Sequence, residues 1–202
     1  MMGLQLDLSV ANDMAARIGA TEKQLKAAMH GALTDSGKAA TIRVKKQVSG
    51  STKISQKRLT VRVKMRRYQD DDSVVLWFGA NPVSFHTVGK IRYTTRSVVA
   101  GRISRRGAFP AHIGGGGLRT FIREASAHYK RGQYGDTVYG VGYKKSPYGS
   151  IKSRFPVRLA VVHIDAEVEA ALATLDHGMQ DIFDKNFLRR LNYEVVVKGK
   201  RV

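Results

Sequence analysis

Six histidines are the side chains of this sequence best suited to bind a metal or to transfer a proton near neutral pH. No two of them stand three or four residues apart, the spacing that places two metal ligands on one face of a helix. Residues 70–72 are consecutive aspartates, whereas a magnesium site needs carboxylates that converge from different elements. We therefore expect no metal site here, and a solvated turn at residues 70–72.

Glycine runs are a second feature that could serve a cofactor. Residues 114–117 are all glycine, but they lack the Lys-Ser or Lys-Thr ending of a phosphate-binding loop, and no apolar strand immediately precedes them. The Gly-Val-Gly of residues 140–142 is too short for a dinucleotide fingerprint. Serine, histidine and acidic residues form no pattern typical of a hydrolase triad. The sequence therefore predicts a protein that is not an enzyme and takes no cofactor.

Excess basic charge is the strongest functional signal. Lysine and arginine total 35 against 16 acidic residues, a net charge of +19, which predicts attraction to nucleic acid, an anionic membrane or an acidic protein surface. The candidate contacts are Arg62, Lys64, Arg66, Arg92, Arg96, Arg102, Arg105 and Arg106. The first three are equally well interpreted as a solvated face, or as partners of acids on a neighbouring subunit. For the other five we expect contact with an acidic partner or with DNA phosphates, independent of base sequence.

Acidic charge is concentrated late in the chain. Residues 165–184 contain acids and no lysine or arginine. The acids are Asp165, Glu167, Glu169, Asp176, Asp181 and Asp184. Basic residues dominate the earlier part of the chain and acids dominate residues 165–184, so one chain has two unlike surfaces. Identical subunits can use such surfaces to pack head to tail in a ring. These six acids are therefore the candidate inter-subunit face.

The first part of the chain predicts a helix followed by a hairpin. Apolar residues at steps of three and four predict a helix over residues 21–48, and Thr21 with Gln24 matches a capping box. Residues 60–68 alternate strictly, and an apolar run follows the aspartates over residues 74–79. These two runs predict a β-hairpin.

The remainder predicts an α+β class and a single domain over residues 1–202. Residues 81–117 are basic and end in the glycine run, so we expect an extended basic arm or loop insertion there. Strands are expected over residues 136–144 and 155–163. A long helix is expected from Asp165, and residues 193–197 are expected to be an edge strand or a tail.

Cysteine is absent, which excludes disulfides and thiolate metal sites and fits folding in a reducing cytosol. Residues 1–10 have neither a basic stretch nor a long apolar run, so no secretory signal is expected. No stretch approaches the roughly 20 apolar residues of a membrane span. We expect a soluble protein without a membrane partner.

The order of the expected elements resembles the minor tail protein Z family of lambda-like phages. Three places carry the resemblance. They are the long helix that leads into the basic residues 38–67, the Arg106-Gly107-Ala108-Phe109 stretch, and Arg154-Phe155-Pro156-Val157 with the strand and helix after it. The resemblance covers most of the chain, and residues 81–120 depart from the family pattern in length and glycine content.

This resemblance implies a virion protein of a phage neck or tail, made in the host cytoplasm. It implies a tail-completion role at the head-proximal end of the tail, without catalysis. The implied assembly is a homo-oligomeric ring, a hexamer that matches the tail tube or a twelvefold ring as the alternative. Its neighbours would be the tail terminator, the tail tube or head–tail connector proteins, with genome DNA in the lumen.

A second interpretation belongs to another class of protein. A free, sequence-independent nucleic-acid-binding protein of ribosomal or nucleoid type would carry the same excess of basic charge. The segregated acids of residues 165–184 favour the ring, because a free DNA-binding protein has little need of an acidic surface. The size of the purified protein distinguishes the two.

Overall fold

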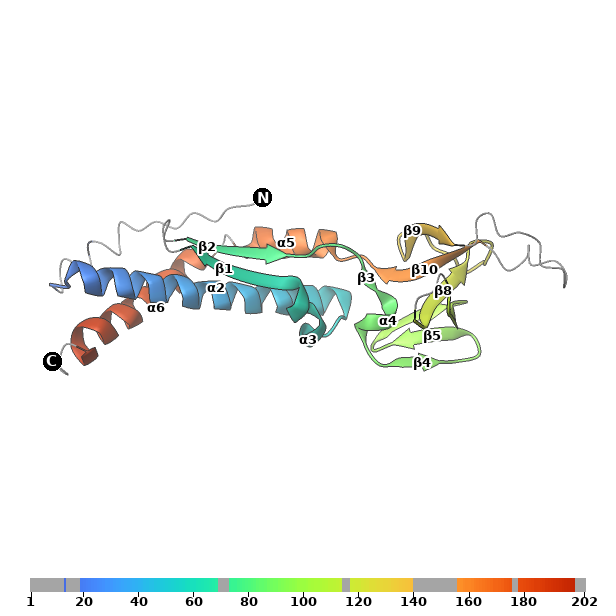
Figure 1. Cartoon of the computed structure of the whole chain (residues 1–202), viewed down its shortest axis with the longest axis horizontal. Helices are drawn as coiled ribbons and strands as arrows, with labels where there is room; N and C mark the ends of the chain where they lie inside the picture. Colours follow the sequence, from blue (N-terminus) through green and yellow to red (C-terminus); the bar gives the residue numbers. More distant parts are fainter. Residues whose placement is uncertain are drawn as a thin grey trace. The chain divides into compact units, whose positions relative to one another are not determined.

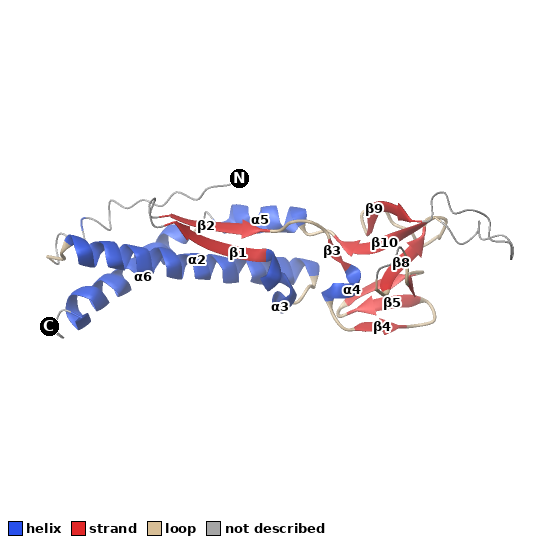
Figure 2. Ribbon diagram, in the orientation of Figure 1, coloured by secondary structure: helices blue, strands red, loops and turns tan. Residues whose placement is uncertain are grey.

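The computed structural model describes residue 13 and residues 19–68, 73–113, 117–139, 156–175 and 178–198. The chain divides into two compact units. Unit 1 comprises Met1–Gln47, Arg62–Phe78 and Glu169–Val202, and unit 2 comprises Val48–Val61 and Gly79–Val168. Helices and antiparallel strands occur together (Figures 1 and 2), which confirms the expected α+β class.

The first long helix, α2 (Glu22–Thr52), begins where the sequence predicts. The backbone N–H of Thr21 donates to Gln24 Oε1 at 2.9 Å, and the backbone N–H of Gln24 donates to Thr21 Oγ1 at 3.4 Å. This reciprocal pair confirms the capping box, which satisfies two of the N–H groups that a helix leaves without partners at its start.

Unit 1 is built on the packing of α2 against α6 (Met179–Asn192). The buried cluster combines small residues of α2 with large residues of α6. Its members are Ala28, Ala32, Phe183, Phe187 and Leu191. In both helices these residues recur every four positions, so the small side chains of one helix leave room for the large side chains of the other. The rings of Phe183 and Phe187 stack with centroids 6.1 Å apart.

The predicted hairpin is confirmed as β1 (Val63–Tyr68) and β2 (Ser73–Phe78), paired antiparallel with Val63 opposite Phe78. The strand begins later than expected, because α3 (Gln56–Leu59) and the 3-10 turn η1 (Thr60–Arg62) precede it. The inner face of the hairpin packs on α2, where a Cβ at Gly37 would lie 2.8 Å from Met65 Sδ and from Val74 Cγ1. The aspartate turn lies outside the described residues.

The C-terminal helical segment consists of two helices, α5 (Asp165–Leu175) and α6. Gly178 stands immediately before α6 with φ +107°, a conformation that glycine adopts without strain, so it can begin a new helix. After α6 the chain continues as a π-helical turn, η3 (Tyr193–Lys198), in place of the edge strand or tail expected there.

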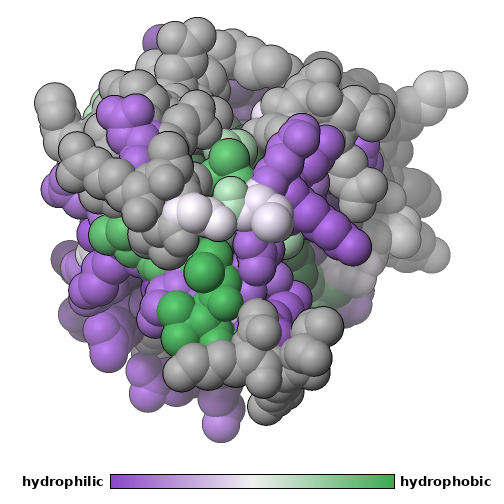
Figure 3. Space-filling model, turned by 90° about the vertical axis from the view of Figure 1, so that its left-hand side faces the viewer, coloured by the Kyte–Doolittle hydropathy of each residue, from purple (hydrophilic) through white to green (hydrophobic). Residues whose placement is uncertain are grey.

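Several apolar side chains of α6 and η3 are exposed. They are Leu188, Tyr193, Val196 and Val197. Figure 3 views the molecule from the side on which the C-terminus lies and shows hydrophobic atoms (green) bordered by hydrophilic ones (purple). No helix among the described residues is long and apolar enough to cross a membrane.

The described strands of unit 2 form two antiparallel sheets. The strands of the larger, five-stranded sheet are β3 (Val83–Ser84), β7 (Phe109–Ala111), β8 (Arg119–Arg123), β9 (Tyr134–Tyr139) and β10 (Val157–Val162). β10 pairs with β3, β8 and β9. It is the apolar strand predicted over residues 155–163, of which residue 155 lies outside the described part. Val157 and Ala160 are fully buried and lie on opposite faces of the strand, so both faces are covered here.

The arm expected over residues 81–117 is a folded part of unit 2, so that prediction is wrong for its described residues. The segment includes β3, the short helix α4 (Phe85–Val88), β7, and the second sheet. This sheet has three strands, β4 (Ile91–Tyr93), β5 (Ser97–Ala100) and β6 (Ile103–Arg106). Phe85, Val98 and Ala100 are almost fully buried. Their burial offsets the entropy lost on ordering, which the basic composition alone does not indicate.

Candidate nucleic-acid and subunit interfaces

A basic pocket of about 480 Å³ lies in unit 2. It is formed where the open end of the β5–β6 pair, the end away from the connecting turn, meets β7 and β8. The side chains that define it are Arg96, Arg106, Phe109, Arg123 and His128, with Gly107 in its wall. Arg96 and Arg106 are two of the predicted contact residues. Arg123 and His128 come from outside the predicted arm.

Strand pairing brings Arg96 and Arg106 together. Ser97 of β5 is opposite Arg106 of β6, so Arg96 lies one residue beyond the last pair of the ladder. The backbone N–H of Gly107 donates to the Arg96 carbonyl oxygen at 2.8 Å and extends the ladder by one hydrogen bond. Arg96 and Arg106, ten positions apart in the chain, therefore both line the pocket from this end of the strand pair.

Gly107 places His128 in the pocket wall. Its φ of +73° favours glycine, and a Cβ added there would lie 3.0 Å from both Cβ and Cδ2 of His128. The absence of a side chain at this position therefore permits the close approach of the two segments.

Arg123 reaches the pocket from β8. Phe109 of β7 is opposite Phe121 of β8, which places Arg123 diagonally across from Phe109. The Arg123 guanidinium carbon lies 5.4 Å from the centroid of the Phe109 ring, within the range of a cation–π contact. The ring thereby orients the guanidinium without neutralising its charge.

No acidic residue lines the pocket among the residues that the structure describes. Within the described ranges, Arg96, Arg106 and Arg123 form no ion pair. The acid next along the chain, Glu124, is bound elsewhere, since Arg158 donates to its Oε1 from Nε at 3.1 Å and from Nη2 at 2.8 Å. This bond is the main reason that the pKa of Arg158 is raised. The three arginines thus line one pocket without an acidic partner among the described residues.

Arg105, predicted as a contact residue, is turned into unit 2 and is not available to a partner. Its Nη2 donates to the carbonyl oxygen of Val161 at 3.3 Å, and its guanidinium carbon lies 5.5 Å from the centroid of the Phe85 ring. Burial lowers the pKa of Arg105. Strand alternation explains the difference, because Arg105 and Arg106 are neighbours in β6 and point to opposite faces.

The remaining arginines of this segment lie outside the pocket. Arg92 is exposed on β4 opposite Val99. Arg102 is exposed in the turn between β5 and β6, at the opposite end of that strand pair from Arg106. The structure therefore divides the five predicted arginines into two in the pocket, one turned inward and two exposed elsewhere.

In unit 1 the outer face of the β1–β2 hairpin is a second candidate surface, called here the outer hairpin face. It presents Lys64, Arg66, Tyr68, Val75 and Trp77, all of them exposed. Lys64 is opposite Trp77 in the ladder, and its Nζ lies 5.8 Å from the centroid of the Trp77 ring. Arg62, the third predicted residue, lies in η1 and not on the strand. An exposed tryptophan beside basic side chains is typical of a protein interface.

The predicted acids fall on the two C-terminal helices. Asp165 and Glu169 are exposed on α5, and Glu167 is half-buried there. On α6, Asp181 is exposed and Asp184 accepts a hydrogen bond from Gln180 Nε2 at 2.9 Å. Asp176 lies outside the described residues. Acids in the first turn of a helix also favour the helix dipole, so part of their role is local.

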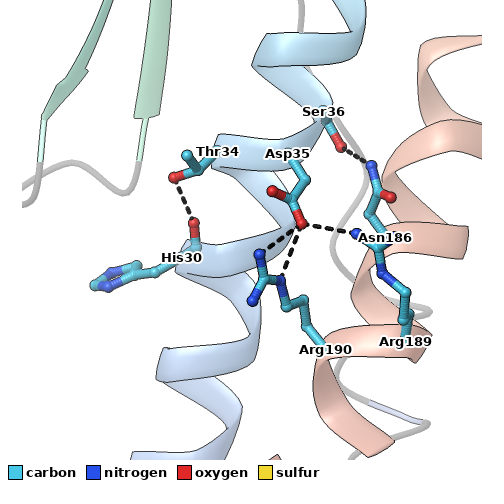
Figure 4. Close-up of polar contacts among 7 residues, drawn as sticks. All are labelled: His30, Thr34, Asp35, Ser36, Asn186, Arg189 and Arg190. Carbon is cyan, nitrogen blue, oxygen red and sulfur yellow. Dashed lines mark hydrogen bonds and ion pairs between the residues drawn. The ribbon is translucent and has the colours of Figure 1, made fainter. Parts of the chain in front are cut away.

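Two arginines of unit 1 are neutralised within the fold, in contrast to those of the pocket. Asp35 of α2 accepts hydrogen bonds from Arg189 Nη2 at 2.8 Å and from Arg190 Nε at 2.9 Å (Figure 4). Beside them Asn186 Nδ2 donates to Ser36 Oγ at 3.1 Å. These contacts join α2 to α6, so their role is structural.

A comparison with protein-family models, curated proteins and solved structures finds no match for this chain. The surfaces from which its function can be inferred are the basic pocket, the outer hairpin face and the acids of α5 and α6.

Proposed function

We propose that this protein is a structural virion component, a tail-completion protein that forms a ring at the head-proximal end of a long phage tail. The outer hairpin face carries the proposal. Trp77 is the single tryptophan of the chain, and it is 55% exposed between basic and apolar neighbours. Leaving such a surface in water is unfavourable, and covering it with a second subunit removes that cost.

Charge supplies the complementary surface. The outer hairpin face is basic, and α5 and α6 of the same chain expose Asp165, Glu169 and Asp181. A surface that fits an unlike surface of an identical subunit generates a closed ring when the rotation between subunits closes. Opposite charges also set the register of such a contact and speed its formation.

The resemblance to the minor tail protein Z family supports the place of the ring. On that basis the ring has sixfold symmetry, with twelvefold as the alternative, and its neighbours are tail terminator, tail tube or head–tail connector proteins. Its role is geometric, since it completes the tail and helps to join it to the head. No catalytic step is part of the proposal.

Sedimentation of the purified protein tests the assembly directly. We expect a defined oligomer that Trp77→Ser converts to smaller species. Ile42→Ser is the matched control, because Ile42 is 57% exposed on α2 and lies outside the hairpin. A protein that remains a monomer over the accessible concentration range, or equal effects of the two substitutions, would count against the outer hairpin face as the subunit contact.

A second function, sequence-independent nucleic-acid binding, is favoured by one observation. The arginines of the basic pocket have no acidic partner within it, so their charge is available to a polyanion. A free binding protein would be monomeric without nucleic acid and would be absent from virions. Sizing and particle composition therefore separate this function from the first.

A further inference from the structure

We propose that the basic pocket of unit 2 binds phosphate groups of a nucleic-acid backbone. The proposal rests on the pocket's own residues and is independent of whether the chain forms a ring. The proposal assigns part of the net charge of +19 to one defined binding site.

The kind and placement of the donors indicate phosphate. Arg96 and Arg106 come from the open end of the β5–β6 pair, and Arg123 comes from β8. A guanidinium group is a planar fork of N–H donors that matches two oxygens of a phosphate, and it stays charged at any physiological pH. Three such forks line one pocket, which suits it to the phosphate groups of one backbone segment.

Electrostatics make an anion the expected occupant. Like charges that line one pocket repel one another, and no carboxylate of the described lining relieves this repulsion. The guanidinium groups are exposed, so binding does not first require them to leave a buried environment. An incoming phosphate can therefore reach all three charges, and because they remain hydrated its attraction to them should weaken with salt.

The size of the pocket leaves room for more than a single ion. The volume of about 480 Å³ lies within the range of roughly 300–1,000 Å³ that is typical of sites for organic ligands. Phe109 adds an apolar wall beneath Arg123, against which a sugar can lie. Readout of sequence would need donors and acceptors aimed at base edges, so we expect binding that is indifferent to sequence.

The test compares two double variants with the same change of charge. Arg96→Ala with Arg106→Ala removes two pocket arginines. Arg92→Ala with Arg102→Ala removes two exposed arginines, one on β4 and one in the turn between β5 and β6, that do not line the pocket. Binding of a short, labelled, single-stranded oligonucleotide of mixed sequence is followed by fluorescence anisotropy at increasing salt. Thermal unfolding confirms that both variants fold.

We expect the pocket variant to bind about tenfold more weakly or worse, which corresponds to the loss of at least one charge-assisted hydrogen bond. Its dependence of log K on log salt should be shallower by about 0.7 for each phosphate that the variant no longer neutralises. The control variant should change affinity by about twofold or less. Equal losses in the two variants would overturn the proposal, because they would place binding on the whole basic surface.

Two further ligands identify the source of the anion. Inorganic phosphate, titrated while the NMR signals of the Gly107 amide and the His128 ring are followed, should shift these signals in the wild type and not in the pocket variant. If phosphate binds there but the pocket variant retains full oligonucleotide affinity, the site serves a free ion and the nucleic-acid proposal is wrong.

Poly-glutamate that displaces the oligonucleotide at equal charge concentration would likewise contradict the nucleic-acid proposal, in favour of an acidic protein. If the protein is a monomer and the pocket variant loses oligonucleotide binding as expected, the proposed ring is refuted and the proposed phosphate site is retained.

Discussion

Arginine is placed in two different ways in the two units. In unit 1, Arg189 and Arg190 share the carboxylate of Asp35, whose side chain is only 15% exposed. In unit 2, Arg96 and Arg106 converge with a third arginine on a pocket that contains no acid. The same side chain therefore joins two helices in one unit and remains available to an external anion in the other.

This contrast shows that net charge alone does not locate function. An arginine that is paired inside the fold contributes to stability, and its removal leaves a carboxylate without its partner. An arginine that converges with others without an acid contributes little to folding, so a role in binding is the better explanation for it. Stability and binding measurements on matched variants can therefore separate the two groups.

The largest expected effect lies in the helix pair of unit 1. Phe183→Ala removes a ring that is fully buried against Ala28 and Ala32, and should lower the free energy of unfolding by about 3–5 kcal/mol. Leu188→Ala on the same helix removes a side chain that is 42% exposed and should cost much less. Denaturant unfolding measures both. Similar losses would mean that α6 does not pack on α2 through the Phe183 face.

The next effect tests how the pocket is built. Gly107→Ala places a Cβ at positive φ and 3.0 Å from His128 Cβ, so strain and overlap together should cost about 2–4 kcal/mol. Gly132→Ala is the control, because Gly132 has φ +84° with nothing within 4 Å and should suffer the backbone strain alone, about 1–2 kcal/mol. Thermal unfolding compares the two. Equal destabilisation would show that the approach of His128 to Gly107 is not tight.

A smaller effect sharpens the comparison of arginines itself. Asp35→Ala should lower the free energy of unfolding by about 1–2 kcal/mol, less than for a fully buried ion pair because the side chains of Arg189 and Arg190 are 66% and 40% exposed. Arg106→Ala should leave stability within about 0.5 kcal/mol of the wild type, since it breaks no described ion pair. The comparison fails if Arg106→Ala destabilises the protein as much as Asp35→Ala does.

The smallest effect is a dependence on pH in unit 2. Burial raises the pKa of Tyr134, a shift that the charge of Arg105 opposes. Because the folded pKa lies above the unfolded value of about 10, folding favours the protonated phenol. Its contribution to stability is complete below that value and is lost as the pH rises through the folded pKa. Unfolding measured between about pH 9 and 11 should therefore show a steeper decline in the wild type than in Tyr134→Phe, and parallel curves would contradict the assigned burial.

Local signals in the sequence predicted the parts of the fold that depend on near neighbours. The capping box of Thr21 and Gln24 and the alternation of β1 are such signals, and each was found as expected. The buried strand β10 was also found, because an apolar run bounded by polar residues has few other stable placements.

The folded state of residues 81–113 could not be read in the same way. Its strands are short and basic, and they are stabilised by pairing and burial around residues such as Val98. The pocket depends on contacts between separate segments, which bring Arg123 and His128 to Gly107. The Arg-Thr-Phe-Ile-Arg sequence of β8, with apolar residues between two arginines, was the one local signal that could have indicated Arg123.

Electron cryomicroscopy of the neck of a virion that contains this chain tests the proposed function most directly. We predict a ring of several copies at the head-proximal end of the tail, in which the outer hairpin face of each subunit is covered by its neighbour. A single copy in the neck, or a ring in which Trp77 remains exposed to solvent, would contradict the proposed assembly.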